Sequence, residues 1–188
     1  MDANELITHY KAGNRDFLQV SLQRAHLSEF CLTGINLSRS DLTGATLSAT
    51  NLRGAILSEA NLAEANLWRA DLTEALMIWA NLHKANLIRA NFCKADLHQA
   101  VLTRADLRLA DLSFADLSNT NLEGADLRYA NLSSANLAGA NLSKANLTGA
   151  KLSQADLYNV NLTKAILLRT DLCDADLNSM TVALTSYS

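Results

Sequence analysis

Leucine recurs at every fifth position along almost the whole chain. From residue 17 to residue 182 this phase contains thirty-four positions, thirty of them Leu and the others Phe17, Met77, Phe92 and Val182. The position two residues before each Leu is Ala in twenty-four of thirty-three units. The residue between the two is Asp or Asn in twenty-four of thirty-four units, so the repeating unit is A-(D/N)-L-x-x.

A period of five fits neither an α-helix nor a flat strand. Five residues turn through about 500° on an α-helix, which would scatter the Leu side chains around the cylinder. On a flat strand successive Leu residues would alternate between faces. Both arrangements leave half of the leucines in water, whereas a chain that bends once per unit directs every Ala and Leu inward. Asp and Asn suit such corners because their side chains bond nearby backbone groups, and the pattern therefore predicts a solenoid.

These units are similar to those of the pentapeptide-repeat family, in its cyanobacterial, HetL-like type, and the resemblance covers residues 16–182. It implies an all-β solenoid, a right-handed quadrilateral β-helix with four units per coil and about eight coils over this length. At a strand spacing of ~4.8 Å the rod would be roughly 40 Å long. Because Val20, Phe30 and Ile35 occupy Ala positions, we expect the first coil or two to be distorted.

Three segments are expected along the chain. Residues 1–15 contain an N-terminal capping helix with Leu6 and Ile7 on one face. Residues 16–182 form the β-helix, and residues 183–188 form a C-terminal tail. The end of a solenoid exposes unpaired backbone and apolar core, so the protein is expected to be a monomer or a homodimer through a solenoid end.

Charge and composition narrow the class of partner. The chain has 188 residues with 16 basic and 19 acidic side chains, a net charge of −3. Such a balance argues against a general nucleic-acid binder, and the apolar runs are far shorter than a membrane span. No signal peptide is visible. An odd number of cysteines, three, then indicates free thiols and a cytoplasmic location.

Candidate chemistry is sparse. Stacking by twenty residues would place four carboxylates in one column, at Asp96, Asp116, Asp156 and Asp176. An enzyme could use two of them as a general acid and base, but most units have Asp or Asn here for their geometry, and a convex rod is not expected to form a deep cleft. The His and Cys residues lack metal-ligand spacing. We therefore expect no catalytic, cofactor-binding or metal site.

The outward positions indicate where a protein partner would bind. On the face that contains Leu67, clustered Arg, Trp and Tyr resemble interface anchors. One column there reads Trp68, Ile88, Arg108 and Arg128, and its neighbour reads Arg69, Arg89, Leu109 and Tyr129. Of these, the candidate interaction residues are Trp68, Arg69, Ile88, Arg89, Arg108, Arg128 and Tyr129. A second candidate patch consists of Ile56, Leu76, Ile78 and Trp79. Either set could equally be ordinary surface or a self-association surface.

The leading functional hypothesis is a non-enzymatic, regulatory module that presents flat solenoid faces to an unidentified protein partner. The resemblance implies a cyanobacterial setting in which some family members act in regulation. The alternative is a DNA mimic that binds type II topoisomerase (gyrase), as quinolone-resistance members of the family do. A net charge of −3 and an arginine-bearing face disfavour that alternative. A purely structural role stays open.

Overall fold

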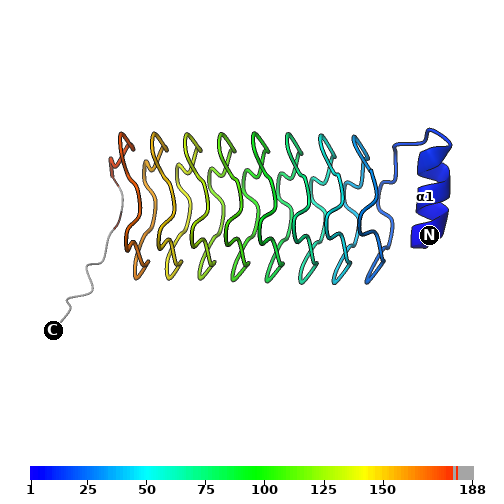
Figure 1. Cartoon of the computed structure of the whole chain (residues 1–188), viewed down its shortest axis with the longest axis horizontal. Helices are drawn as coiled ribbons and strands as arrows, with labels where there is room; N and C mark the ends of the chain where they lie inside the picture. Colours follow the sequence, from blue (N-terminus) through cyan, green and yellow to red (C-terminus); the bar gives the residue numbers. More distant parts are fainter. Residues whose placement is uncertain (180, 182–188) are drawn as a thin grey trace.

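Each five-residue unit stacks on the unit that lies twenty residues further along the chain. The computed structural model describes residues 1–179 and residue 181, in which parallel β-bridges join residues twenty apart, from Asp16↔Asn36 to Asn161↔Thr181. Each bridge occupies one residue, and the described residues contain no longer strand. Four units therefore close one coil, and the coils stack into a rod that has helix α1 (Ala3–Lys11) at one end (Figure 1).

The ladder of bridges is regular from the first coil onward, so the expected distortion is absent from the ladder, but the side chain of Phe30, in an Ala position, is 38% exposed. The bridges Ser21↔Asp41 and His26↔Thr46 continue the ladder without a break. Ile35 is fully buried in its Ala position. Larger side chains fit here because no coil precedes the first one, and α1 lies in that place instead.

Every corner of the coil is a β-turn whose third residue has a positive φ angle. In one unit the N–H of Ala25 donates to the carbonyl of Leu22 at 3.0 Å, and Arg24 has a φ of 55°. The same position is left-handed in all thirty-three turns from residue 19 to residue 179, yet only six of them have Gly there. This conformation costs an L-residue roughly 1–2 kcal/mol, so the stacking of coils, and not local preference, imposes the turn.

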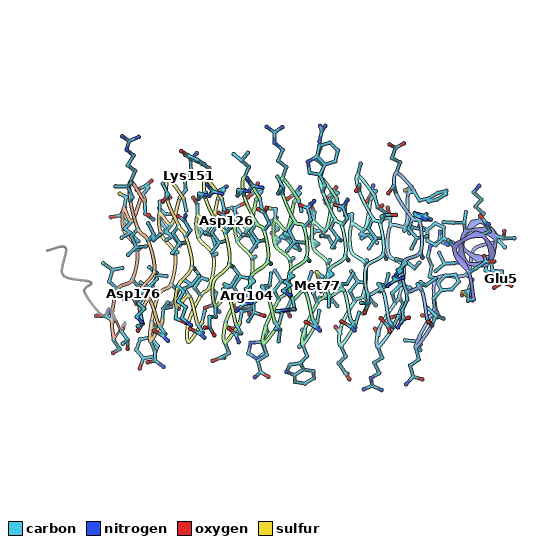
Figure 2. All side chains as sticks on the ribbon, turned by 90° about the horizontal axis from the view of Figure 1, so that it is seen from below. Glu5, Met77, Arg104, Asp126, Lys151 and Asp176 are labelled. Carbon is cyan, nitrogen blue, oxygen red and sulfur yellow. The ribbon has the colours of Figure 1, made fainter. Side chains whose placement is uncertain are left out.

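The interior is a column of leucines between layers of alanine. The Leu positions are buried from Leu22 to Leu162, and Met77 and Phe92 are buried in the same phase. Where Ser40 replaces Ala, its hydroxyl donates to a carbonyl inside the rod at 3.0 Å, and Thr50 does the same at 2.7 Å. These hydrogen bonds remove the penalty of burying the hydroxyl groups. Long polar side chains project outward from the turns (Figure 2).

The Asp or Asn of each unit ties a bridge to the turn that follows it. The Oδ1 atom of Asp41 accepts from the N–H of Thr43 at 3.0 Å. The asparagines also form ladders, since Asn141 Nδ2 donates to Asn121 Oδ1 at 3.3 Å and Asn161 donates to Asn141 at 3.2 Å. The predicted bond to nearby backbone is present, but the residue precedes the corner and lies in the bridge.

Helix α1 covers the first coil. Asp2 caps the helix because its side chain accepts from the N–H of Glu5 at 2.9 Å, and the Glu5 side chain accepts from the N–H of Asp2 at 3.0 Å. Leu6 and Ile7 are buried against the core, and the Tyr10 hydroxyl donates to the carbonyl of Thr33 at 2.8 Å. The predicted helical cap is thereby confirmed.

The opposite end of the rod is less well covered by the described residues. Leu162 is buried, Leu167 and Leu172 are half-buried, and Leu177 is 40% exposed. Residues 183–188, the predicted tail, lie outside the described residues. The three-segment division of the chain stays a prediction.

Candidate protein-interaction site

The candidate residues of the Leu67 face lie on one corner of the coil. They occupy the two central positions of successive β-turns, in the columns Trp68, Ile88, Arg108, Arg128 and Arg69, Arg89, Leu109, Tyr129. Their side chains therefore project from an edge of the rod. The expectation of a flat interaction face is wrong for this set, because the two positions after each inward Leu are the ones that turn. We call these two columns the Leu67 edge.

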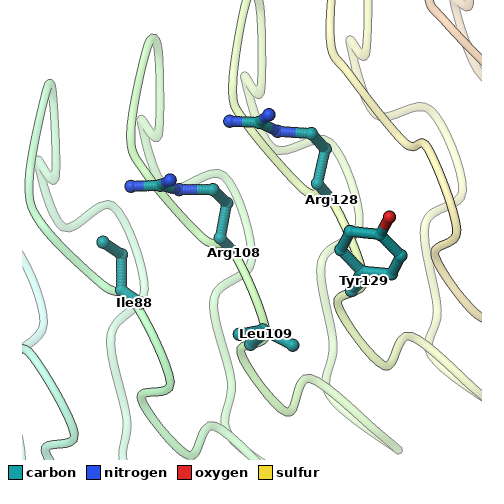
Figure 3. A pocket seen from close by; sticks show the side chains of 5 residues that line it. All are labelled: Ile88, Arg108, Leu109, Arg128 and Tyr129. Carbon is teal, nitrogen blue, oxygen red and sulfur yellow. The ribbon is translucent and has the colours of Figure 1, made fainter.

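A pocket of about 340 Å³ opens on the Leu67 edge. Figure 3 shows the side chains of Arg108 and Arg128 running side by side, with Leu109 and Tyr129 across from them and Ile88 at one end. Leu109 is 48% exposed and Tyr129 is 62% exposed, whereas Ile88 is half-buried. Five residues from three coils therefore build one hollow with both apolar and cationic walls.

The two arginines of the pocket are held by carboxylates from their own units. Arg108 donates from Nε and a terminal nitrogen to Asp106 at 2.8 and 2.7 Å, and Arg128 makes the same paired contacts with Asp126 at 2.8 and 2.6 Å. Burial raises the pKa of the Asp126 carboxyl, but the hydrogen bonds and charge of Arg128 outweigh it and lower that pKa overall. Bidentate pairing fixes these two side chains as walls of the pocket.

The other two arginines of the edge are available to a partner. Arg69 and Arg89 have no carboxylate within 4.0 Å among residues 1–179 and 181. The guanidinium of Arg69 lies 5.2 Å from the ring centroid of Trp68, within the range of a cation–π contact. Of the four arginines that the sequence predicts on this edge, two thus form ion pairs with carboxylates and two do not, among the described residues.

Charge is distributed unequally around the rod. We define the basic side as the Leu67 face with its two flanking edges. It carries ten basic and five acidic side chains, and the rest of the chain carries six basic and fourteen acidic ones. The basic residues are Arg24, Arg69, Lys84, Arg89, Arg104, Arg108, Arg128, Lys144, Lys164 and Arg169, and the acidic ones are Glu29, Glu64, Asp106, Glu123 and Asp126. A chain with a net charge of −3 therefore has one side with five excess positive charges.

The second candidate patch lies elsewhere on the rod. Ile56 and Leu76 form a β-bridge in the middle of a side, and Ile78 and Trp79 lie on the turn that follows. Leu76 and Trp79 are exposed, and the indole nitrogen of Trp79 donates to Gln99 one coil later. The structure brings these four residues together on one surface.

Several relevant residues were missing from the candidate set. Leu109 was left out, although its apolar side chain at an outward position signalled it and it lines the pocket. The basic edge on the other flank of the Leu67 face was also missed. That edge is recognised only when residues separated by twenty or a multiple of twenty are read as one column. Its basic members are Lys84, Arg104, Lys144 and Lys164.

The carboxylate column has a structural part in the coil. The Oδ1 atoms of Asp96 and Asp116 accept from the N–H groups of His98 and Ser118 at 3.0 and 2.9 Å. Asn136 also donates to Asp116 at 3.2 Å. These are the hydrogen bonds that the Asp or Asn of other units makes. The pocket on the Leu67 edge and a second pocket, lined by Ile7, Tyr10, Lys11, Arg15, Phe30 and Cys31, include none of these carboxylates.

The cysteines and the other residues that could bind a metal ion do not form a cluster in the described part of the chain. Cys31, Cys93 and Cys173 are free thiols. In the described part of the chain, no three His, Cys, Asp or Glu side chains are grouped so that they could hold a metal ion. None of the helices found over these residues has the length and apolar character needed to cross a membrane.

A protein-family model for pentapeptide repeats matches the chain in overlapping segments. The matched residues are 21–58, 41–77, 55–92, 75–113, 105–143 and 140–178. No curated protein matches the chain. Pentapeptide repeats form right-handed quadrilateral β-helices, so the four-unit coil confirms the fold expected from the sequence.

Solved structures are similar to this chain over most of its length. HetL, a pentapeptide repeat protein involved in heterocyst differentiation regulation in the cyanobacterium Nostoc sp. strain PCC 7120, is 37% identical, with 97% of each chain covered and a TM-score of 0.34. The Nostoc protein alr5209 is 40% identical over 58% of this chain and 80% of its own, with a TM-score of 0.48. Trypsin-treated QnrB1, a plasmid-mediated fluoroquinolone resistance protein, is 21% identical over 89% of each chain, with a TM-score of 0.53, a likeness in fold alone. The repeat match, which extends over more than half of the chain, shows that the chain belongs to the pentapeptide repeat family.

Proposed function

We propose that this chain is a non-enzymatic regulatory module that binds a protein partner through the Leu67 edge. The observation that carries this proposal is the pocket between Arg108, Arg128, Leu109 and Tyr129. Exposed Tyr and Trp side chains next to arginines are the usual anchors of protein interfaces. Trp68, 40% exposed, extends the same edge beyond the pocket.

The regulatory part of the proposal draws on the relatives. HetL is described as involved in regulating heterocyst differentiation, and the identity to it extends over nearly the whole chain. Three free thiols support a reducing, cytoplasmic setting. Asp96 and Asp116 bind the backbone of the following turn, as the Asp or Asn of other units does, and this structural use supports a role without catalysis.

Affinity capture from a lysate of Nostoc, the source of two of the relatives, tests the proposal. The bait proteins are wild type, the edge variant Trp68→Ala/Arg89→Glu, and a control variant, Lys94→Glu/Phe114→Ala. The control makes the same kind of change on a different edge, where Phe114 is also exposed.

We expect a protein that wild type and the control variant retain and the edge variant loses. Equal retention by all three would remove the Leu67 edge from the account. Loss with the control variant alone would move the interaction to the edge that carries Phe114. The patch around Trp79 is the second candidate surface, and Trp79→Ala in the same assay tests it.

A further inference from the structure

We propose that the Leu67 edge binds an acidic protein segment that carries one large apolar side chain. This inference rests on the proposed interaction function and adds the chemistry of the partner. The apolar side chain would enter the pocket, and the carboxylates of the segment would meet Arg89 and Arg69.

The pocket needs an apolar group because its open wall is apolar. Leu109 and Tyr129 keep about half or more of their surface in water, and Ile88 closes one end of the hollow. The opposite wall is held by ion pairs, since Arg108 and Arg128 are each bound twice by a carboxylate. A side chain that enters removes apolar surface from water.

The segment must also be acidic, because the unpaired charge beside the pocket is positive. Arg89 lies one coil before Leu109 in the same column, and Arg69 lies one coil before Arg89. Neither has a carboxylate partner among the described residues. Arginine binds carboxylates in a bidentate geometry, and the excess positive charge of the basic side would attract an acidic partner from a distance.

The same edge favours carboxylates over the phosphates of a nucleic acid. Asp106 and Asp126 already occupy Arg108 and Arg128, so Arg69 and Arg89 are the arginines of this edge that have no carboxylate partner among the described residues. The two free arginines stand in one short row next to an apolar hollow. A row of this kind matches a few carboxylates and one hydrophobic side chain better than a continuous polyanion.

The geometry also limits the length of the segment. Four coils separated by ~4.8 Å each extend over about 14 Å, which an extended chain crosses in about four or five residues. The turns that carry Arg69 and Tyr129 are held by backbone hydrogen bonds between coils, at 3.0 Å in both cases. The edge thus presents its groups at a fixed spacing to a short extended segment.

A peptide selection identifies the chemistry of the ligand directly. A phage library of random dodecapeptides is selected on the wild-type protein and counter-selected on Arg89→Glu/Leu109→Ser. We expect the discriminating peptides to have a net negative charge and to contain Leu, Ile, Phe or Trp. The best of them, as a synthetic peptide, should bind the double variant at least about tenfold more weakly. Arg89→Lys should retain part of the affinity, and the thermal unfolding of each variant shows that it is folded.

Three other outcomes overturn the inference. The first is enrichment of basic or uncharged peptides, or no peptide that distinguishes the variant from wild type. The second is tighter binding to a short DNA oligonucleotide, measured by fluorescence anisotropy, than to the best peptide. The third is a homodimer that Arg89→Glu dissociates in sedimentation experiments, which would make a second copy the occupant. If one of these results is obtained but the capture experiment succeeds, the acidic-segment inference is wrong and the proposed interaction function stands. If the capture experiment also fails, the proposed interaction function is wrong as well.

Discussion

The aromatic ring of Tyr129 lies against the backbone of Gly149 in the next coil. A Cβ atom on residue 149 would meet the ring at 2.6 Å, so the absence of a side chain there allows this position of the ring. Gly149 also has a φ of 68°. One glycine therefore both forms its turn without strain and shapes the wall of the pocket.

We predict that Gly149→Ala moves the Tyr129 ring and costs little stability beyond backbone strain. The ring is largely exposed and can swing outward, so the loss in unfolding free energy should be about 1–2 kcal/mol. Gly54→Ala is the matched control, because a Cβ there would contact nothing within 4 Å. Urea unfolding and the NMR shifts of the Tyr129 ring protons measure the two effects. Unchanged ring shifts in Gly149→Ala would show that the glycine does not position the ring.

A non-glycine residue in a left-handed turn should gain stability when it is replaced by glycine. Ala49 has a φ of 55° and no side-chain function that the change would remove. We expect Ala49→Gly to raise the free energy of unfolding by about 0.5–1 kcal/mol, after the entropy cost of Gly is subtracted. Chemical denaturation checks this value. A loss of stability would mean that the turns are not strained.

The buried phase of leucines should be far more sensitive than the exposed ones. Leu107 is fully buried, and we expect Leu107→Ala to cost about 2–5 kcal/mol in unfolding free energy. Leu168 is 63% exposed, so Leu168→Ala should have little effect. Thermal unfolding of both variants tests the assignment, and similar midpoints would contradict it.

The pair between Asp126 and Arg128 should make a small, pH-dependent contribution to stability. Because the pKa of Asp126 is lowered in the folded protein, its contribution is present above the unfolded pKa, about 3.9, and disappears as the pH falls through the folded value. We expect wild type to exceed Asp126→Asn by up to about 1 kcal/mol near neutral pH. The difference should vanish well below pH 3.9 and shrink in high salt. If the stability difference between wild type and Asp126→Asn grew as the pH fell, the predicted direction of the pH dependence would be wrong.

The alternative of a DNA mimic gives a separate prediction. The candidate strip, Asp96, Asp116, Asp156 and Asp176, is one column wide and interrupted by Asn136, which donates to Asp116. A large excess of the protein should therefore leave the supercoiling activity of gyrase unchanged. Inhibition in that assay would revive the alternative.

The sequence predicts most of the fold because burial follows a fixed phase. Every Leu of the pattern from Leu22 to Leu162 is buried, and substitutions such as Phe92 keep the phase. The conformation of the turns was less predictable, since Gly marks only six of the left-handed positions and the stacking of coils enforces the rest. Composition alone also gave no warning that the candidate columns lie on an edge.

The positions of the candidate columns on the coil were predictable, but the ion pairs among their side chains were not. The columns of Trp68 and Arg69 follow directly from the twenty-residue register. Ion pairing, however, depends on side-chain conformation. Arg108 is paired with Asp106 whereas Arg89 is not paired with a described carboxylate, although both arginines belong to the same candidate set. The contact between Tyr129 and Gly149 depends in the same way on the direction of one ring.

Site-specific photo-crosslinking in Nostoc tests the central claim, that a protein partner contacts the Leu67 edge, most directly. A photoreactive phenylalanine derivative replaces Trp68, Trp79 or Phe114 in three separate variants, each exposed and each on a different part of the surface. The account predicts one crosslinked protein from position 68 and none from positions 79 and 114. Crosslinking from position 79 or 114 alone would place the interaction elsewhere and contradict the account.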